Sequence, residues 1–141
     1  MDPAARERAY VALGSNLGDR SAHLQYARQA LAALPGTALI ATSSVEETAP
    51  LAGMDQPPYL NQMVLLETEL TPRALLEAGQ AIERRAGRVR TVRWGPRTLD
   101  VDIVRFGERH LAEPDLIIPH PELPHRDFWL RELAELQPYD R

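Results

Sequence analysis

Residues 98–106 read TLDVDIVRF, and the alternation of apolar and polar side chains in this stretch predicts a β-strand. Asp100 and Asp102 would lie on one face of that strand and the apolar residues between them on the other. The apolar face needs a core to cover it. Two carboxylates with Cβ atoms about 7 Å apart repel each other unless a cation or an arginine lies between them, which makes the acidic face a candidate metal site. The alternative is a solvated strand face with incidental acids, since ion-pair networks imitate such sites.

The residues before this strand predict three further strands and two helices. The helices begin at caps, at Asp19 or Ser21 for the first and at Thr71, followed by Pro72, for the second. Gly87 suits the left-handed position past the end of the second helix. The predicted strands span 9–13, 38–48 and 59–70, and the first helix ends at Pro35-Gly36.

The order β-α-β-β-α-β predicts an α+β protein of the ferredoxin-like class, with an antiparallel sheet and both helices on one face. A short third helix is expected after Arg126, with Leu130, Leu133 and Ala134 facing inward. The connections 49–58 and 87–97 are long and are expected to act as lids or binding walls. The whole chain, 1–141, is expected to form a single domain.

Composition narrows the function classes. The 141 residues include no cysteine and no lysine, which excludes thiolate chemistry, Schiff bases and the P-loop lysine. The net charge of −4 argues against a nucleic-acid binder that relies on overall charge. The sequence shows neither an apolar leader nor a stretch long enough to span a membrane, so a cytoplasmic, soluble protein with no membrane partner is expected.

The segment 84–97 holds six arginines and no acid. Guanidinium groups grip phosphate oxygens in pairs, so this charge beside two aspartates favours a polyphosphate site. The alternative, a favourable helix end, explains the first two better than the last four. The six are Arg84, Arg85, Arg88, Arg90, Arg93 and Arg97.

Aromatic and amide side chains suggest a second subsite. Tyr59 and Asn61 share a strand face, and Phe128 could supply an opposite wall for a flat heteroaromatic ring with an amide edge. Core aromatics and a turn asparagine are the alternative interpretation. His120, between two prolines, is more plausible as a phosphate donor than as a metal ligand, because no third ligand is evident.

Taken together, these motifs resemble the family of 6-hydroxymethyl-7,8-dihydropterin pyrophosphokinases. The stretch 93–104, RWGPRTLDVDIV, is similar to the family's signature. Four more motifs follow the family's order along the chain, at 12–18, 55–61, 87–90 and 118–121. The resemblance implies ATP as diphosphate donor, AMP as product and two Mg²⁺ ions bound with ATP, with no covalent enzyme intermediate.

The resemblance also implies roles for individual residues. Metal ligands would be Asp100 and Asp102, and these two would join Arg88 and Arg97 as catalytic residues. Nucleotide contacts would be Gln80, Glu83, Arg88, Arg97, Ile103, His120 and Arg126. Pterin contacts would be Thr48, Leu51, Tyr59, Asn61, Trp94, Asp100 and Phe128.

The sequence departs from the family pattern at Ala52, Asp115 and Ile117, and Glu46 stands where an aromatic residue is common. Two other classes compete with the enzyme. An RNA-binding module would need exposed aromatic side chains on the central strands, where the first strand offers only Tyr10. A sensor would keep the nucleotide pocket without turnover. We expect a monomer whose only partners are its two small-molecule substrates.

Overall fold

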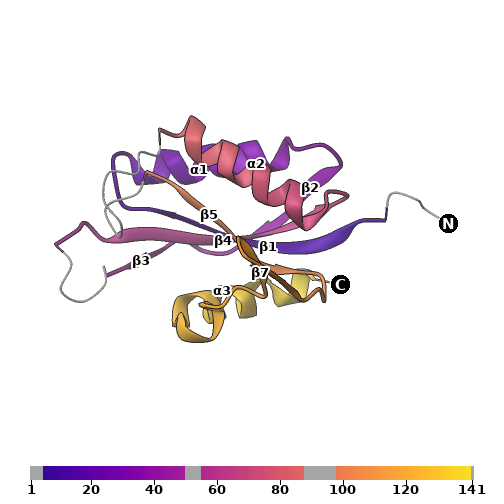
Figure 1. The fold of residues 1–141 in the computed structure, drawn as a ribbon. Coiled ribbons are helices and arrows are strands. Elements are labelled where there is room, and N and C mark those ends of the chain that lie inside the picture. Colours follow the sequence, from indigo (N-terminus) through magenta and orange to yellow (C-terminus); the bar gives the residue numbers. More distant parts are fainter. Residues whose placement is uncertain (1–4, 50–54, 88–97, 141) are drawn as a thin grey trace.

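The computed structural model describes residues 5–49, 55–87 and 98–140, and Figure 1 shows their arrangement. The strands are β1 (Glu7–Ser15), β2 (Thr37–Thr42), β3 (Glu46–Thr48), β4 (Tyr59–Thr68), β5 (Asp100–Phe106), β6 (Leu111–Glu113) and β7 (Leu116–Ile118). The α-helices are α1 (Arg20–Ala32), α2 (Pro72–Arg85) and α3 (Asp127–Leu136), and short 3-10 turns span Leu123–His125 and Gln137–Tyr139.

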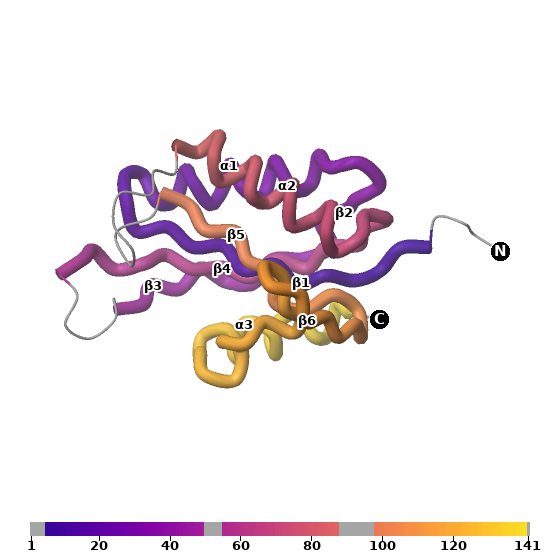
Figure 2. The backbone as a smooth tube through the Cα atoms, viewed as in Figure 1, coloured from indigo at the N-terminus to yellow at the C-terminus, as the bar shows by residue number. Residues whose placement is uncertain are grey.

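The long strands form one antiparallel sheet in the order β2-β4-β1-β5, and β3 pairs with β4 beyond the end of β2. Helix α1 connects β1 to β2, and α2 connects β4 to β5. Figures 1 and 2 show both helices on one face of the sheet and α3 on the other. This order is the ferredoxin-like arrangement, so the predicted α+β class is confirmed.

Both predicted helix caps are confirmed. The side chain of Asp19 accepts a hydrogen bond from the amide of Ala22 at 3.1 Å, and Thr71 Oγ1 accepts one from the amide of Ala74 at 3.1 Å. Such caps are predictable because donor and acceptor lie only three residues apart. Gly87 has φ of +83°, the left-handed conformation expected there.

The single strand predicted over 38–48 is wrong in one respect, because residues 43–45 interrupt it. Ser43 keeps the pairing with β4 partly through its side chain, since its Oγ accepts from the amide of Met63 at 2.9 Å. The backbone and side chain of Ser44 both bind Glu135 of α3 instead of a strand. A contact from the far end of the chain therefore divides β2 from β3.

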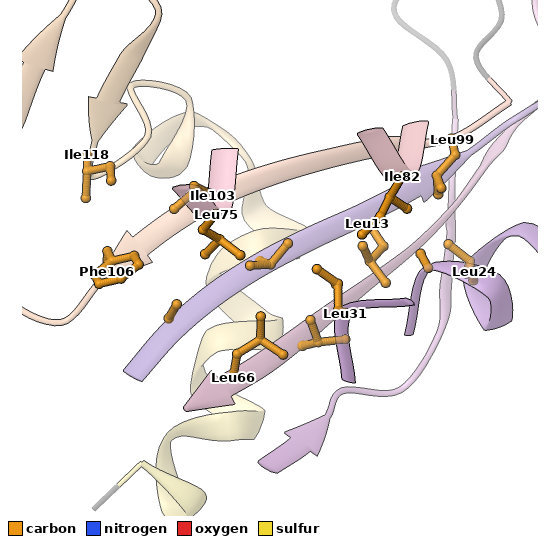
Figure 3. Packing of buried hydrophobic residues seen from close by; sticks show 14 of the residues in the cluster. Leu13, Leu24, Leu31, Leu66, Leu75, Ile82, Leu99, Ile103, Phe106 and Ile118 are labelled. Atoms are coloured by element: carbon orange, nitrogen blue, oxygen red, sulfur yellow. The ribbon is translucent and has the colours of Figure 1, made fainter. Parts of the chain in front are cut away.

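The main core lies between the sheet and helices α1 and α2 (Figure 3). Leu24 and Leu31 of α1 and Leu75 and Ile82 of α2 meet apolar side chains from the central strands, among them Leu13. Full burial of each such side chain contributes about 1.5–3 kcal/mol. This core fixes α2, and with α2 the edge strand β5.

A smaller apolar cluster lies on the opposite face, beneath α3. It joins Tyr10, Met63, Leu65 and Val104 to the helix. The expected inward face of α3 is wrong in part, because Leu130 and Ala134 are exposed while Leu133 is buried as expected. The helix turns a different stripe to the sheet, made of Trp129, Glu132, Leu133 and Leu136.

Two features near β5 did not emerge from the sequence. The short hairpin β6–β7 packs Leu116 and Ile118 into the main core. Strand β5 also bulges, because Tyr10 pairs with Arg105 and Val11 with Ile103, which leaves Val104 without a partner in β1. The bulge lets Val104 join the cluster beneath α3 while Ile103 and Phe106 join the main core.

The end of the described chain is fastened to β1. Arg8 Nη1 donates to the carbonyl of Tyr139 at 2.9 Å, and the hydroxyl of Tyr10 donates to Asp140 Oδ2 at 2.9 Å. Burial of Tyr10, together with its bond to the Asp140 carboxylate, raises the pKa of its phenol to about 12. No helix in the described ranges has the length and apolar character needed to cross a membrane.

Candidate active site

Asp100 and Asp102 lie on the face of β5 that faces away from α1 and α2. Leu99, Val101 and Ile103 belong to the main core, as the alternation predicted. Across the sheet, Asp100 pairs with Gly14 of β1 and Asp102 pairs with Ala12. Because directly paired residues of antiparallel strands share a face, both carboxylates lie on the α3 side of the sheet. Both are partly exposed.

Gly14 places Asp100 near the amide of Asn61. Gly14 pairs with Asp100 on one side and with Asn61 of β4 on the other, so the three residues form one row across the sheet. A Cβ at Gly14 would lie 3.4 Å from Asn61 Oδ1 and 3.5 Å from Cδ1 of Tyr59. Because glycine has no side chain, Asn61 and Tyr59 can lie close to β1 at this position. Sequence reasoning had not given Gly14 this role.

Three of the residues implied for the pterin lie together. Thr48 pairs with Tyr59, and Asn61 Nδ2 donates to Thr48 Oγ1 at 2.6 Å. Asn61 is nearly buried, at 7% exposure, so this bond fixes the orientation of its amide. Phe128 comes to the same side of the sheet on α3, half-buried against the cluster beneath that helix. The structure thus brings Thr48, Tyr59 and Asn61 together and places Phe128 on the same side of the sheet.

A pocket of about 240 Å³ lies along β5 beside Asp102. Ile103 and His120, both implied for ATP, line this pocket. Its outer wall comes from the hairpin β6–β7, which sequence reasoning missed. A signal was present, because Pro114-Asp115 between two short apolar runs is a turn sequence typical of a hairpin. The pocket is lined by Leu76, Val101, Asp102, Ile103, Pro114, Asp115, Leu116, Ile117, His120 and Pro121.

The bulge of β5 helps to hold His120. The carbonyl of Val104 accepts from the amide of His120 at 2.9 Å, and His120 Nδ1 accepts from the amide of Glu122 at 3.1 Å. Burial lowers the pKa of His120, and the nearby charge of Arg126 adds to this effect. The ring is therefore neutral at pH 7 with its proton on Nε2, which makes Nε2 a hydrogen-bond donor.

The ring of Trp129 contacts both His120 and Arg126. The ring of His120 meets the ring of Trp129 edge to face, with centroids 4.9 Å apart. The guanidinium of Arg126 lies 4.4 Å from the centroid of the Trp129 ring, within the range of a cation–π interaction. Trp129 is 2% exposed and so provides a rigid base for both groups. Sequence reasoning did not single out Trp129.

Glu83 and Gln80, also implied for ATP, lie on α2. Glu83 is buried, and its Oε2 accepts from the backbone amide of Val101 at 2.8 Å. Gly79 makes this possible, because a Cβ there would come within 3.1 Å of Val101 Cγ1, and its absence lets α2 approach β5. Glu83 thus fixes the strand that carries both aspartates. Gln80 is exposed one turn away.

The structure shows the surroundings of two residues that depart from the family pattern, Asp115 and Ile117. The Asp115 carboxylate binds Arg73 of α2 at 2.8 Å, and this guanidinium lowers the pKa of Asp115. Ile117 is exposed at the pocket rim. Leu51, Ala52, Arg88, Arg90, Arg93, Trp94 and Arg97 lie outside the described residues.

Tyr10 is buried beneath α3, and the competing RNA-binding interpretation required it to be exposed. The fold is instead α+β, with Asp100 and Asp102 partly exposed on the α3 side of its antiparallel sheet. The sequence profile of one family, described as 7,8-dihydro-6-hydroxymethylpterin-pyrophosphokinase (HPPK), matches residues 10–138, and the chain belongs to this family. The resemblance inferred from the sequence is confirmed.

Individual relatives support the same family assignment. The chain is 48% identical over 132 residues to 2-amino-4-hydroxy-6-hydroxymethyldihydropteridine pyrophosphokinase of Pseudomonas aeruginosa, covering 94% of this chain and 82% of the relative. It is 47% identical over 131 residues to the Bacillus subtilis enzyme of the same description, covering 91% and 77% respectively. A crystal structure of Plasmodium falciparum HPPK-DHPS aligns with a TM-score of 0.70 at 15% identity, covering 96% of this chain and 40% of that one, which supports the shared fold.

Proposed function

We propose that this chain transfers diphosphate from ATP to the hydroxymethyl group of 6-hydroxymethyl-7,8-dihydropterin, releasing AMP. Membership in the HPPK family supports the reaction. The observation that carries the site assignment is the row Asp100–Gly14–Asn61 across β5, β1 and β4. It puts a carboxylate suited to a metal–phosphate centre beside an amide suited to a pterin edge.

The pterin subsite is assigned to the side chains around Asn61. Its amide offers both a donor and an acceptor, which matches the amide-like edge of a pterin ring. The bond to Thr48 holds the amide in one orientation. Tyr59 and Phe128 are the aromatic walls of this proposal, and Leu51 and Trp94 complete it from segments outside the described residues.

The nucleotide subsite is assigned to the pocket along β5. Ile103 supplies an apolar surface, and the Nε2 proton of neutral His120 supplies a donor for a phosphate oxygen. Arg126 is held close by on Trp129. Gln80 and Glu83 contribute from α2, and Arg88 and Arg97 bind the triphosphate in this proposal.

The donor set on β5 suits magnesium. In the described ranges no group of three or more acidic or histidine side chains is gathered as a metal cage. Mg²⁺ does not need one, because it binds through one or two carboxylates, waters and substrate phosphates. Asp100 and Asp102 would therefore hold two ions together with ATP. When bound, the ions neutralise phosphate charge and acidify the substrate hydroxyl.

The protein's part in the reaction is then positioning and exclusion of water. Asn61 and the aromatic walls orient the pterin so that its hydroxymethyl oxygen faces the β-phosphorus of ATP. A bond forms between that oxygen and the phosphorus as the bond to the α,β-bridging oxygen breaks, and the hydroxyl proton leaves to solvent. AMP carries away the bridging oxygen. In this proposal the enzyme acts as a monomer.

The test is product analysis with purified protein, ATP, Mg²⁺ and the pterin alcohol. Equal amounts of AMP and pterin diphosphate are expected. ADP with pterin monophosphate would replace this proposal by ordinary phosphoryl transfer. Binding of ATP and the pterin without product would favour the sensor. A steep dependence of RNA affinity on salt would favour the RNA-binding alternative.

A further inference from the structure

Helix α3 is joined to the segment 44–46 by three acidic or basic side chains. Glu135 accepts from both the amide and the hydroxyl of Ser44, each at 2.9 Å. Arg131 donates to Oε1 of Glu46 through Nη2 at 3.0 Å and through Nε at 3.2 Å. Glu132, on the inner side of the helix, faces Glu46 as well. We refer to Ser44, Glu46, Arg131, Glu132 and Glu135 as the α3–β3 junction.

A buried carboxyl group in the α3–β3 junction, Glu132, faces a second one, Glu46, that is buried in part. Glu132 is 1% exposed, and neither of its side-chain oxygens has a hydrogen-bond partner among the described residues. Oε2 of Glu46 is likewise buried without a partner in that part of the chain. An ionised carboxylate only accepts hydrogen bonds, so two facing carboxylates cannot satisfy each other. Burying both as anions would cost several kcal/mol.

A single proton on Glu132 removes the repulsion between the two carboxylates. A protonated Glu132 can donate to Oε2 of Glu46, which pairs both orphaned groups. Arg131 determines where the proton resides, because its guanidinium stabilises the negative charge of Glu46. Burial, together with the neighbouring carboxylate of Glu46, raises the pKa of Glu132 to about 9, and the charge of Arg131 lowers it by less.

Apart from Arg131, the titratable groups described around Glu132 include Glu135 on its own helix and Tyr10 of β1 in the cluster beneath α3, and neither is a cation. On its own helix, Glu135 is a second negative charge that disfavours ionisation of Glu132. The cluster beneath α3 brings Met63 and Leu65 from β4 and Ile40 and Ala41 from β2, and none of these side chains titrates. Burial and the neighbouring carboxylate of Glu46 therefore set the protonation state of Glu132.

We propose that Glu132 and Glu46 share one proton at neutral pH, and that this pair positions the two sides of the pterin subsite relative to each other. The inference rests on the proposed pterin subsite. Glu46 pairs with Asn61 and lies two residues before Thr48 on β3. Phe128 lies one helical turn before Glu132 on α3. The shared proton thus connects the amide side of the subsite to its aromatic side.

The pair has a definite pH dependence. In the unfolded chain Glu132 loses its proton near pH 4.5, whereas in the folded protein it keeps the proton until about pH 9. Between these values the folded state binds more protons, so this group lowers the free energy of unfolding as pH rises. Above about pH 9 both carboxylates are charged, and their repulsion separates β3 from α3.

Infrared difference spectroscopy tests the shared proton without reference to activity. The wild-type protein at pH 7 should show the band of a protonated carboxylic acid, and Glu132→Gln should lose it. Glu108→Gln is the control, since it removes an exposed carboxylate that is not part of the α3–β3 junction and should keep the band. In Glu46→Gln the band should disappear at a lower pH than in wild type. A wild-type protein without the band at pH 7 would overturn the inference.

The positioning role is tested by KM for the pterin between pH 7 and 10. In wild type and Glu108→Gln this KM should rise several-fold relative to Glu132→Gln, whose neutral amide still donates to Glu46. KM for ATP should change with pH in the same way in all three proteins. The free energy of unfolding should fall with pH more steeply in wild type than in Glu132→Gln. Identical pterin profiles in all three proteins would overturn the positioning role. Absence of pterin binding and of AMP formation at every pH would instead overturn the proposed function.

Discussion

The two faces of the sheet are built differently. Beneath α1 and α2 the strands present a continuous apolar surface that includes Leu13 and Phe106. Leucine side chains of the two helices cover this surface. Beneath α3 a smaller apolar cluster lies beside Asn61 and Glu132, both buried, and near two aspartates. Buried polar groups cost free energy unless they are paired. The larger core provides the stability that lets the other face carry polar chemistry.

The largest expected effect is on the helix-covered face. Phe106 is fully buried in the main core, so Phe106→Ala should lower the free energy of unfolding by about 3–5 kcal/mol through lost burial and a cavity. Denaturant unfolding followed by circular dichroism measures this. Phe128→Ala, on the half-buried residue of the other face, is the comparison and should cost less stability while raising KM for the pterin. Equal stability losses would contradict the division between faces.

The next effect is on activity alone. Asp100→Asn should lower kcat by at least ~10²-fold, about 2.7 kcal/mol, because a neutral amide cannot replace a carboxylate beside a metal and phosphate. The partly exposed side chain should leave the free energy of unfolding nearly unchanged. Steady-state kinetics at saturating Mg²⁺ provide the measurement, with Glu108→Gln as an exposed carboxylate control. Near-normal turnover would remove Asp100 from the site.

A smaller effect sharpens the assignment of the pterin subsite. Thr48→Val removes the acceptor that orients the Asn61 amide, at a cost of about 1 kcal/mol, so KM for the pterin should rise about fivefold while kcat changes little. Thr42→Val is the matched control, since Thr42 is exposed at the end of β2. Calorimetric titration with the pterin gives the affinity directly. A parallel change in the control would show that the Asn61 amide is not the determinant.

The smallest effect returns to the helix-covered face. Thr71→Ala removes the cap of α2 and should destabilise the protein by about 1 kcal/mol, whereas Thr71→Gly should cost only a few tenths. Thermal unfolding distinguishes the two. KM for either substrate should not change, because Thr71 is at the end of α2 opposite to Glu83. A changed KM for ATP would contradict this expectation and show that the cap of α2 affects the nucleotide subsite.

Features set by nearby residues were predictable from the sequence. The caps at Asp19 and Thr71 depend on contacts three residues long, and the placement of Asp100 and Asp102 depends on the two-residue period of a strand. The family's motifs also led to Thr48, Tyr59 and Asn61, which the structure gathers.

Features set by distant residues were not predictable in this way. The break between β2 and β3 depends on Glu135, some ninety positions away, through its bonds to Ser44. The inward face of α3 was predicted from Leu130, Leu133 and Ala134, whereas the structure buries Glu132 there and exposes Leu130. The bulge at Val104 follows from the pairing of two strands and has no local signal.

The position of β1 has a consequence for how the protein is made. It precedes every other described strand in sequence, yet it lies in the centre of the sheet between β4 and β5. During synthesis both edges of β1 stay unpaired until β4 and β5 leave the ribosome, about fifty and ninety residues later. Nascent chains that stop before β5 would expose one unpaired edge of β1, and these are the chains on which we expect chaperones to act.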